Sequence, residues 1–138
     1  MMIAAALAVL LFGLCGAVHA QAMSLVMRLA ERKSLTGMQG LIVALYMLAT
    51  AHVVEAGLYA LGFALGDRLE IGGFEADKVS SFMDVFYFSV VNYTSLGLGD
   101  IYPTGHLRFL AGIEALNGFL LISCSASTIF LVTTRGKK

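Results

Sequence analysis

Residues 81–104 read Ser-Phe-Met-Asp-Val-Phe-Tyr-Phe-Ser-Val-Val-Asn-Tyr-Thr-Ser-Leu-Gly-Leu-Gly-Asp-Ile-Tyr-Pro-Thr, and this stretch decides the fold. Its first part, Ser81–Tyr93, is apolar but only about 13 residues long, whereas a helix that crosses a bilayer needs about 20 residues. Glycines at 97 and 99 and the proline at 103 then mark a turn. A short apolar helix followed by a glycine-rich turn is typical of a re-entrant segment, which enters a membrane and leaves it on the same side.

The whole chain has the composition of a membrane protein. Of its 138 residues, 59% are hydrophobic and 13% are charged, with a formal net charge of +0, whereas soluble domains carry about 45–50% apolar and about 25% charged residues. A soluble domain this small could not bury so much apolar surface. The composition disfavours a disordered chain, a nucleic-acid binder and a disulfide scaffold. Cys15 and Cys124 lie in apolar runs, where we expect reduced packing residues.

Three further stretches are apolar and long enough to span a bilayer, from about Ile3 to Met27, Gly40 to Leu65 and Leu107 to Thr133. We therefore expect an all-α integral membrane protein with three transmembrane helices and one re-entrant helix. Six of the nine basic residues form two clusters, Arg28/Arg32/Lys33 and Arg135/Lys137/Lys138. The positive-inside rule places both clusters in the cytoplasm. The N-terminus is then outside, the C-terminus is cytoplasmic, and the re-entrant segment enters from outside.

Residues 1–20 also have features of a secretory signal peptide that ends at Val18-His19-Ala20. However, no lysine or arginine precedes the apolar run, and such residues usually mark the start of a signal. Cleavage would also leave the basic cluster at residues 28–33 outside the cell. We therefore expect a retained helix.

The glycine-rich turn has the chemistry of a cation path. Alternate glycines in Ser95-Leu96-Gly97-Leu98-Gly99 allow backbone angles that are closed to other residues, so that successive carbonyls can point to one side. Rows of carbonyl oxygens around an axis can replace the hydration shell of a cation. The C-terminal end of the short helix carries a partial negative charge, which also favours a cation. One chain supplies one row, so this mechanism requires several copies.

Residues 86–104 resemble the pore loop of potassium channels of the two-helix and two-pore-domain type, whose pattern is roughly Tyr-Phe-Ser-x-x-Thr-x-Thr-Thr-Val-Gly-Tyr-Gly-Asp-x-x-Pro. The segment from Gly112 onward is similar to that family's inner helix, and the resemblance is closest to short bacterial channel-like proteins without a cytoplasmic domain. It implies a homotetramer around one pore in the inner (plasma) membrane, in contact with lipid. It further implies passive transport of potassium, or of monovalent cations with potassium preferred, with no enzymatic activity, no cofactor and no nucleic-acid partner. Residues 38–138 would form the pore domain, and residues 1–37 an extra helix and basic loop.

The resemblance also implies roles for individual residues. It assigns the potassium-coordinating carbonyls to Ser95, Leu96, Gly97 and Leu98, the foot of the filter to Thr94, and the outer mouth to Gly99 and Asp100. Leu98 replaces the usual tyrosine and removes a hydroxyl that would tie the filter to aromatic side chains, although Tyr87, Phe88 and Tyr93 remain nearby. Gly118 falls near the glycine at which many inner helices of the family bend, and is therefore a candidate gating position.

Ionisable groups within the predicted spans are further candidates, because burying them in a membrane is costly. His52 and Glu55 are three positions apart and share one helix face. They form either a hydrogen-bonded pair that ties helices together or a proton-sensitive gate, since histidine titrates near neutrality. Glu114 is a third gating candidate, and we expect it to tether the re-entrant helix. His19 and His106 are interpreted as interfacial residues.

The polar residues of the third span form two stripes at helical spacing. Asn117, Leu121, Cys124 and Thr128 share one stripe, and Ser123 and Ser127 share the other. One stripe is expected to line a wet vestibule and the other to hydrogen-bond between helices. The sequence does not decide which.

Two other functions stay open. An intramembrane metalloenzyme would use His52, Glu55 and Glu114, but metal sites in helical bundles usually need several carboxylate–histidine sets on facing helices. A non-conducting accessory or regulatory membrane protein with a channel-like fold is the second. In that case the first helix would be the partner surface; otherwise we expect it at the periphery of the tetramer.

Overall fold

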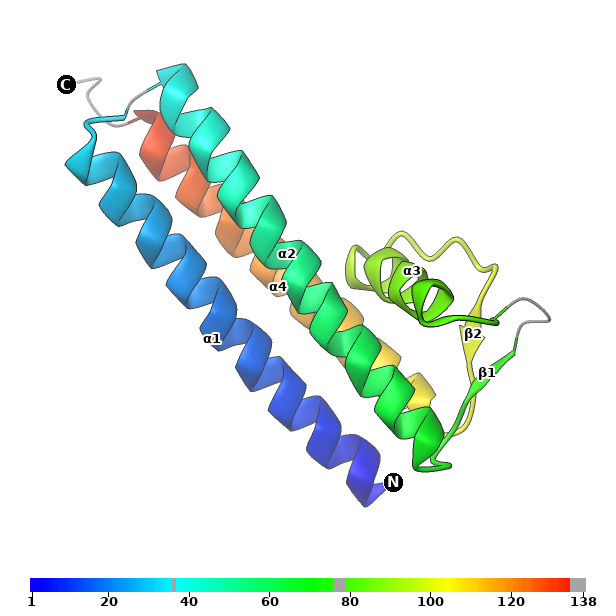
Figure 1. The fold of residues 1–138 in the computed structure, drawn as a ribbon. Helices are drawn as coiled ribbons and strands as arrows, with labels where there is room; N and C mark the ends of the chain where they lie inside the picture. The colour runs from blue at the N-terminus through cyan, green and yellow to red at the C-terminus, as the bar shows by residue number, and fades with distance from the viewer. Residues whose placement is uncertain (36, 76–78, 135–138) are drawn as a thin grey trace.

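Three long helices, one short helix and two short strands form the described part of the chain in the computed structural model (Figure 1). The elements are α1 (Met2–Arg32), α2 (Gly37–Arg68), β1 (Phe74–Glu75), α3 (Phe82–Tyr93), β2 (Tyr102–Pro103) and α4 (Leu107–Thr134). The structure describes residues 1–35, 37–75 and 79–134. The basic residues Arg135, Lys137 and Lys138 therefore lie outside the described residues.

The three predicted spans are confirmed as helices long and apolar enough to cross a membrane. Each helix extends past the predicted apolar limits, because polarity ends an apolar stretch but does not end a helix. α1 continues from Met27 to Arg32 through Arg, Leu, Ala and Glu, all of which are good helix formers.

The predicted short helix is also confirmed, and its start is stabilised by Asp84. The Oδ2 atom of this residue accepts hydrogen bonds from the backbone N–H groups of Ser80 and Ser81, both at 2.9 Å. These bonds hold the pKa of the Asp84 carboxyl below its usual range. A carboxylate in the first turn also interacts favourably with the helix dipole.

Strands β1 and β2 join the two ends of the loop that carries α3. They pair antiparallel, with Phe74 opposite Pro103. Beside them, the Thr104 N–H donates to the Gly73 carbonyl at 2.8 Å. Gly72 permits this approach, because a Cβ there would lie 2.3 Å from the Thr104 carbonyl oxygen. The loop therefore leaves the bundle and rejoins it at one place.

The long helices lie side by side, and α3 lies across the α2–α4 pair from α1 (Figure 1). The larger apolar cluster surrounds Tyr59, Phe63, Phe88 and Leu110, and the rings of Phe63 and Phe88 meet edge-on with centroids 5.2 Å apart. The end of α4 lies beside the α1–α2 connection, while the N-terminus lies at the opposite end (Figure 1). The chain thus forms a three-helix bundle with a short helix and loop on one side.

Candidate functional site

The segment after α3 alternates in backbone conformation. The φ angle is positive at Ser95 (58°), Gly97 (56°) and Gly99 (76°), but not at Leu96 or Leu98 between them. Positive φ is open to glycine and uncommon for serine. The predicted need for glycine at 97 and 99 is therefore confirmed, and Ser95 adopts the same conformation despite its side chain.

Both ends of this segment are held by hydrogen bonds to α3. At the start, the Thr94 hydroxyl contacts the carbonyls of Val90 at 3.0 Å and Val91 at 3.1 Å. At the other end, the Tyr87 hydroxyl donates to Asp100 Oδ2 at 2.8 Å. This bond raises the pKa of the Tyr87 phenol, because ionisation would remove the proton that the carboxylate accepts. Tyr87 thus supplies a hydroxyl tie that Leu98 cannot.

Between those ends, the N–H groups of Ser95 and Leu96 donate to the α3 carbonyls of Asn92 at 2.9 Å and Val91 at 3.0 Å, but the side chains of the two leucines that follow Ser95 are exposed. Leu96 is 65% exposed and Leu98 is 57% exposed. A Cβ at Gly97 would find no atom within 4 Å. Two neighbouring apolar side chains that their own chain leaves uncovered mark a surface suited to contact with another molecule.

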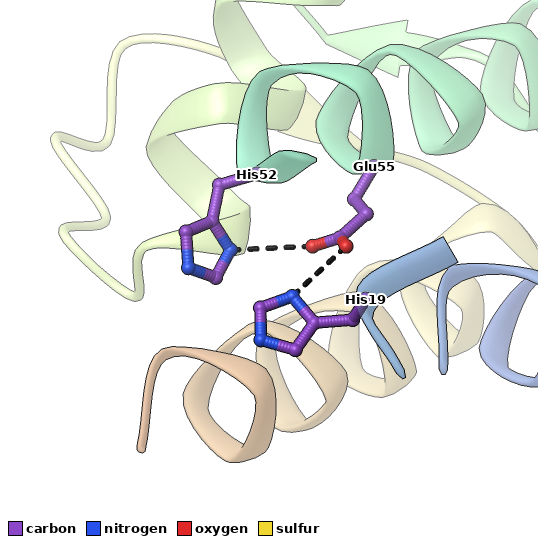
Figure 2. A group of neighbouring side chains, drawn as sticks. All are labelled: His19, His52 and Glu55. Atoms are coloured by element: carbon purple, nitrogen blue, oxygen red, sulfur yellow. Dashed lines mark hydrogen bonds and ion pairs between the residues drawn. The ribbon is translucent and has the colours of Figure 1, made fainter. Parts of the chain in front are cut away.

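A second polar site lies inside the bundle, and each of the four helices contributes to it. Glu55 of α2 is fully buried. Its Oε1 atom lies 3.0 Å from His19 Nδ1 of α1, and its Oε2 atom lies 3.2 Å from His52 Nδ1 (Figure 2). The Tyr93 hydroxyl of α3 donates to Glu55 Oε2 at 2.5 Å. On the far side of the two rings, Ser125 Oγ of α4 lies 2.9 Å from His52 Nε2 and 3.2 Å from His19 Nε2. We call these five residues the interhelix cluster.

The predicted contact between His52 and Glu55 is confirmed, and their bonds to three other helices fit the interpretation that they tie the bundle together. The proton-sensitive gate stays a prediction. The interpretation of His19 as interfacial is wrong, since only 1% of it is exposed. The sequence did contain evidence that His19 is buried. It lies at helical spacing from four small or apolar residues that form the buried face of α1, namely Ala4, Ala8, Leu11 and Cys15. His19, Tyr93 and Ser125 are the members of the cluster that sequence reasoning missed.

Glu114 joins α4 to α3, which confirms the predicted tether to the re-entrant helix. It is fully buried. Its Oε1 atom lies 2.5 Å from the hydroxyl of Ser89, and its Oε2 atom accepts from Asn92 Nδ2 at 2.5 Å. The same Ser89 hydroxyl lies 2.6 Å from the Ala56 carbonyl of α2. A role of Glu114 in gating stays a prediction.

The structure does not bring together the three metal ligands predicted from the sequence, His52, Glu55 and Glu114. Among the described residues, the ligand atoms that lie within 4.8 Å of one another belong to His19, His52 and Glu55. Glu114 lies outside this group because its carboxylate is bonded to α3. That form of the metalloenzyme hypothesis is therefore wrong.

The two polar stripes of α4 differ in burial. Asn117 and Thr128 are buried, and Asn117 Nδ2 donates to the Tyr59 hydroxyl of α2 at 3.0 Å. Ser123 and Ser127 are exposed. Cys124 departs from its stripe because it is exposed as well, whereas Cys15 is buried, and both are free thiols. Gly118 is buried in a helix that continues from Leu107 to Thr134.

Comparisons with known proteins identify the family of this chain. A sequence model of the family described as "Ion channel" matches residues 42–135, which include most of α2, the α3 loop and all of α4. The match covers well over half of the chain. The chain belongs to this ion channel family. The prediction of a potassium-channel pore-domain resemblance is thereby confirmed, as is the all-α membrane channel fold.

This member of the ion channel family is also similar to the inward rectifier potassium channel Kirbac3.1 of Paramagnetospirillum magnetotacticum. The two are 36% identical over 91 residues, which make up 64% of this chain and 29% of that protein. The chain therefore spans less than a third of that relative's length. No solved structure matches. Membership of the family points to a multi-pass membrane transport protein rather than an enzyme, and the matched residues leave α1 outside.

Proposed function

We propose that the chain is the pore-forming subunit of a passive cation channel that prefers potassium. The observation that carries this proposal is the alternation of positive φ at Ser95, Gly97 and Gly99, directly after a short helix. The segment lies within the residues that match the ion channel family. The name of Kirbac3.1, a potassium channel, supports potassium as the cation.

In this proposal the carbonyls of Ser95, Leu96, Gly97 and Leu98 coordinate potassium as it sheds its water. Thr94 forms the foot of the filter, and Gly99 and Asp100 form its mouth. The C-terminal end of α3 directs its partial negative charge towards the foot. At the mouth, Asp100 is held by Tyr87 and raises the local concentration of cations. No cofactor takes part, and potassium is the transported species.

The active form is a homotetramer. Each chain supplies one row of carbonyl oxygens, and several rows are needed to surround a potassium ion. Neighbouring subunits cover Leu96 and Leu98, which their own chain leaves exposed. In this assembly α1 faces the lipid at the periphery, and its position across the α2–α4 pair from α3 (Figure 1) supports this. Ser123 and Ser127 line the vestibule below the filter, because their stripe is polar and is not buried within the chain.

The orientation follows from the positions of the basic residues. Arg28, Arg32 and Lys33 lie at the end of the bundle where α4 also ends (Figure 1). The positive-inside rule makes that end cytoplasmic in a plasma membrane. The N-terminus and the entrance of the filter are then outside.

Flux from liposomes that contain the purified protein tests this function. We expect potassium efflux that exceeds sodium efflux. In Gly97→Ala the positive φ costs an alanine about 1–2 kcal/mol in every subunit, so potassium flux should fall about tenfold or more. The fold should survive, because a Cβ there meets no atom within 4 Å.

Gly13→Ala is the matched control, since its Cβ also meets no atom within 4 Å and its backbone is helical. This variant should conduct like the wild type. Absence of flux for both cations at every pH and voltage would contradict the proposal and favour a non-conducting accessory protein. Equal flux through Gly97→Ala and the wild type would contradict the assignment of the filter.

A further inference from the structure

We propose that the interhelix cluster binds one first-row transition dication, typified by zinc, with His19, His52 and Glu55 as its ligands. The site lies within one chain, between α1 and α2. It is separate from the proposed filter, whose oxygens suit potassium. Binding is measured without any flux, so this proposal and the proposed channel function can fail independently.

The ligand atoms already have spacings close to those of a tetrahedral site. Zinc binds imidazole nitrogen and carboxylate oxygen at about 2.0–2.2 Å, which separates neighbouring ligand atoms by about 3.3–3.5 Å. Glu55 Oε1 lies 3.0 Å from His19 Nδ1, and Glu55 Oε2 lies 3.2 Å from His52 Nδ1 (Figure 2). The ligand atoms of all three residues lie within 4.8 Å of one another. Small changes in side-chain angles are therefore enough to surround one ion.

The hydrogens on the two histidine rings can be arranged in more than one way. In a mixed arrangement His19 Nδ1–H donates to Glu55, His52 Nε2–H donates to Ser125, and the Tyr93 hydroxyl lies 3.0 Å from His52 Nδ1, so that each ring nitrogen has a partner without a cation. With Glu55 ionised and both histidines neutral, each ring has one N–H. If both Nδ1 atoms carry the hydrogen, the single Ser125 hydroxyl proton cannot serve both Nε2 atoms, which lie 2.9 and 3.2 Å away. If both Nε2 atoms carry it, two nitrogen lone pairs face the carboxylate of Glu55. The binding experiment distinguishes the mixed arrangement from this last one, which one cation between the Nδ1 atoms and the carboxylate completes.

In that arrangement the remaining contacts match those that surround known metal ligands. Both Nε2–H groups donate to Ser125 Oγ, whose two lone pairs accept them. The Tyr93 hydroxyl donates to Glu55 Oε2. Metal-binding histidines usually donate their second N–H to an oxygen in this way, and ligating carboxylates are themselves hydrogen-bonded. Ser125 and Tyr93 are thus positioning residues for the three ligands.

The donor set also determines which ions fit. Two imidazoles and one carboxylate suit zinc and its first-row neighbours, whereas magnesium and calcium prefer oxygen ligands alone. His52 is partly exposed, with 20% of its side chain accessible, and this gives an ion a route into an otherwise buried site. Because Tyr93 directly precedes Thr94, a bound ion would also immobilise the start of the proposed filter.

Equilibrium dialysis against zinc, with metal content measured by mass spectrometry, tests the proposal. The protein carries no polyhistidine tag, and the exposed Cys124 is changed to serine throughout to remove an adventitious ligand. We expect one zinc per chain. His19→Ala and His52→Ala should each weaken binding by about 100-fold or more, whereas His106→Ala, at an exposed histidine outside the cluster, should bind like its parent. Cobalt should report a tetrahedral site by its visible absorption, and magnesium should not compete.

Two variants keep the test decisive if the histidine variants fail to fold. Glu55→Gln keeps the size of the side chain and removes its charge, and Ser125→Ala keeps all three ligands and removes the shared acceptor. Each should weaken zinc binding by about 10–100-fold and lose the rise in unfolding temperature that zinc gives the parent. The absence of saturable binding at one ion per chain would overturn the proposal and leave a shared proton as the occupant. Unchanged binding in Glu55→Gln and Ser125→Ala, or loss of binding in His106→Ala, would also overturn it.

Discussion

Gly118 of α4 lies directly against the backbone carbonyl of Tyr93, the last residue of α3. A Cβ at this glycine would lie 2.0 Å from the Tyr93 oxygen, which is closer than any real contact of such atoms. The two helices can therefore meet here only because residue 118 has no side chain. This contact fixes the position of α4 relative to the residue from which the proposed filter begins.

Gly118→Ala should therefore destabilise the protein by about 1–3 kcal/mol, the usual cost of overpacking a core. The obstructing atom belongs to the backbone and cannot rotate away. Denaturant unfolding in detergent measures this loss. Gly13→Ala should be at least as stable as the wild type, because alanine is a better helix former than glycine. Equal stability of the two variants would show that α3 and α4 are not in such close contact.

Glu114→Ala should be destabilised by about 1–3 kcal/mol, because Ser89 and Asn92 lose a buried hydrogen-bond partner. Glu114→Gln should retain most of the stability, since its amide oxygen can accept from Asn92 and its amide group can donate to Ser89. Thermal unfolding of the two variants beside the wild type makes the comparison. A glutamine variant as unstable as the alanine variant would mean that charge, and not hydrogen bonding, holds Glu114 in place.

Tyr87→Phe removes the hydroxyl that binds Asp100 and should reduce the preference for potassium over sodium. A filter without this tie is less rigid and discriminates less between ions of different size. The permeability ratio from liposome flux is the measurement. Tyr46→Phe is the control, because that tyrosine is exposed on α2, away from the filter. A ratio unchanged in Tyr87→Phe would show that the bond does not support selectivity.

Cysteines placed at Ser123 and Ser127 should react with a charged thiol reagent and block potassium flux, because we assign these residues to the vestibule. Cysteines at Asn117 and Thr128 should stay unreactive, since both positions are buried between helices. All proteins carry Cys124→Ser. Reaction at residues 117 and 128 but not at 123 and 127 would reverse the assignment of the two stripes.

Asp84 should titrate below the ordinary aspartate pKa of about 3.9, because two N–H groups and the Ser81 hydroxyl bind its carboxylate. A lowered pKa means that its contribution to stability is present above the ordinary value. That contribution is lost as the pH falls through the lowered one. The NMR shift of a labelled Asp84 carboxyl carbon follows this titration. An ordinary pKa would show that the hydrogen bonds at the start of α3 are absent in solution.

The sequence predicted those features that depend on neighbours along the chain. The short helix before the filter follows from the length of the apolar run Ser81–Tyr93, and the contact of His52 with Glu55 follows from their spacing. The partners His19 and Ser125 could not be found in this way, since they lie on other helices and meet Glu55 and His52 only if each helix is turned correctly. Lipid-facing and buried faces are both apolar in a membrane protein, so hydrophobic periodicity gives little information on that rotation.

The pairing of β1 with β2 has a consequence for engineering. Because Phe74 lies opposite Pro103, the two ends of the loop between the strands lie next to each other at one end of the helical bundle. The stretch that carries the proposed filter can thus be exchanged as one unit. A chimera that receives the equivalent stretch of a relative needs to match only the distance between two anchors, while the long helices keep their own sequence.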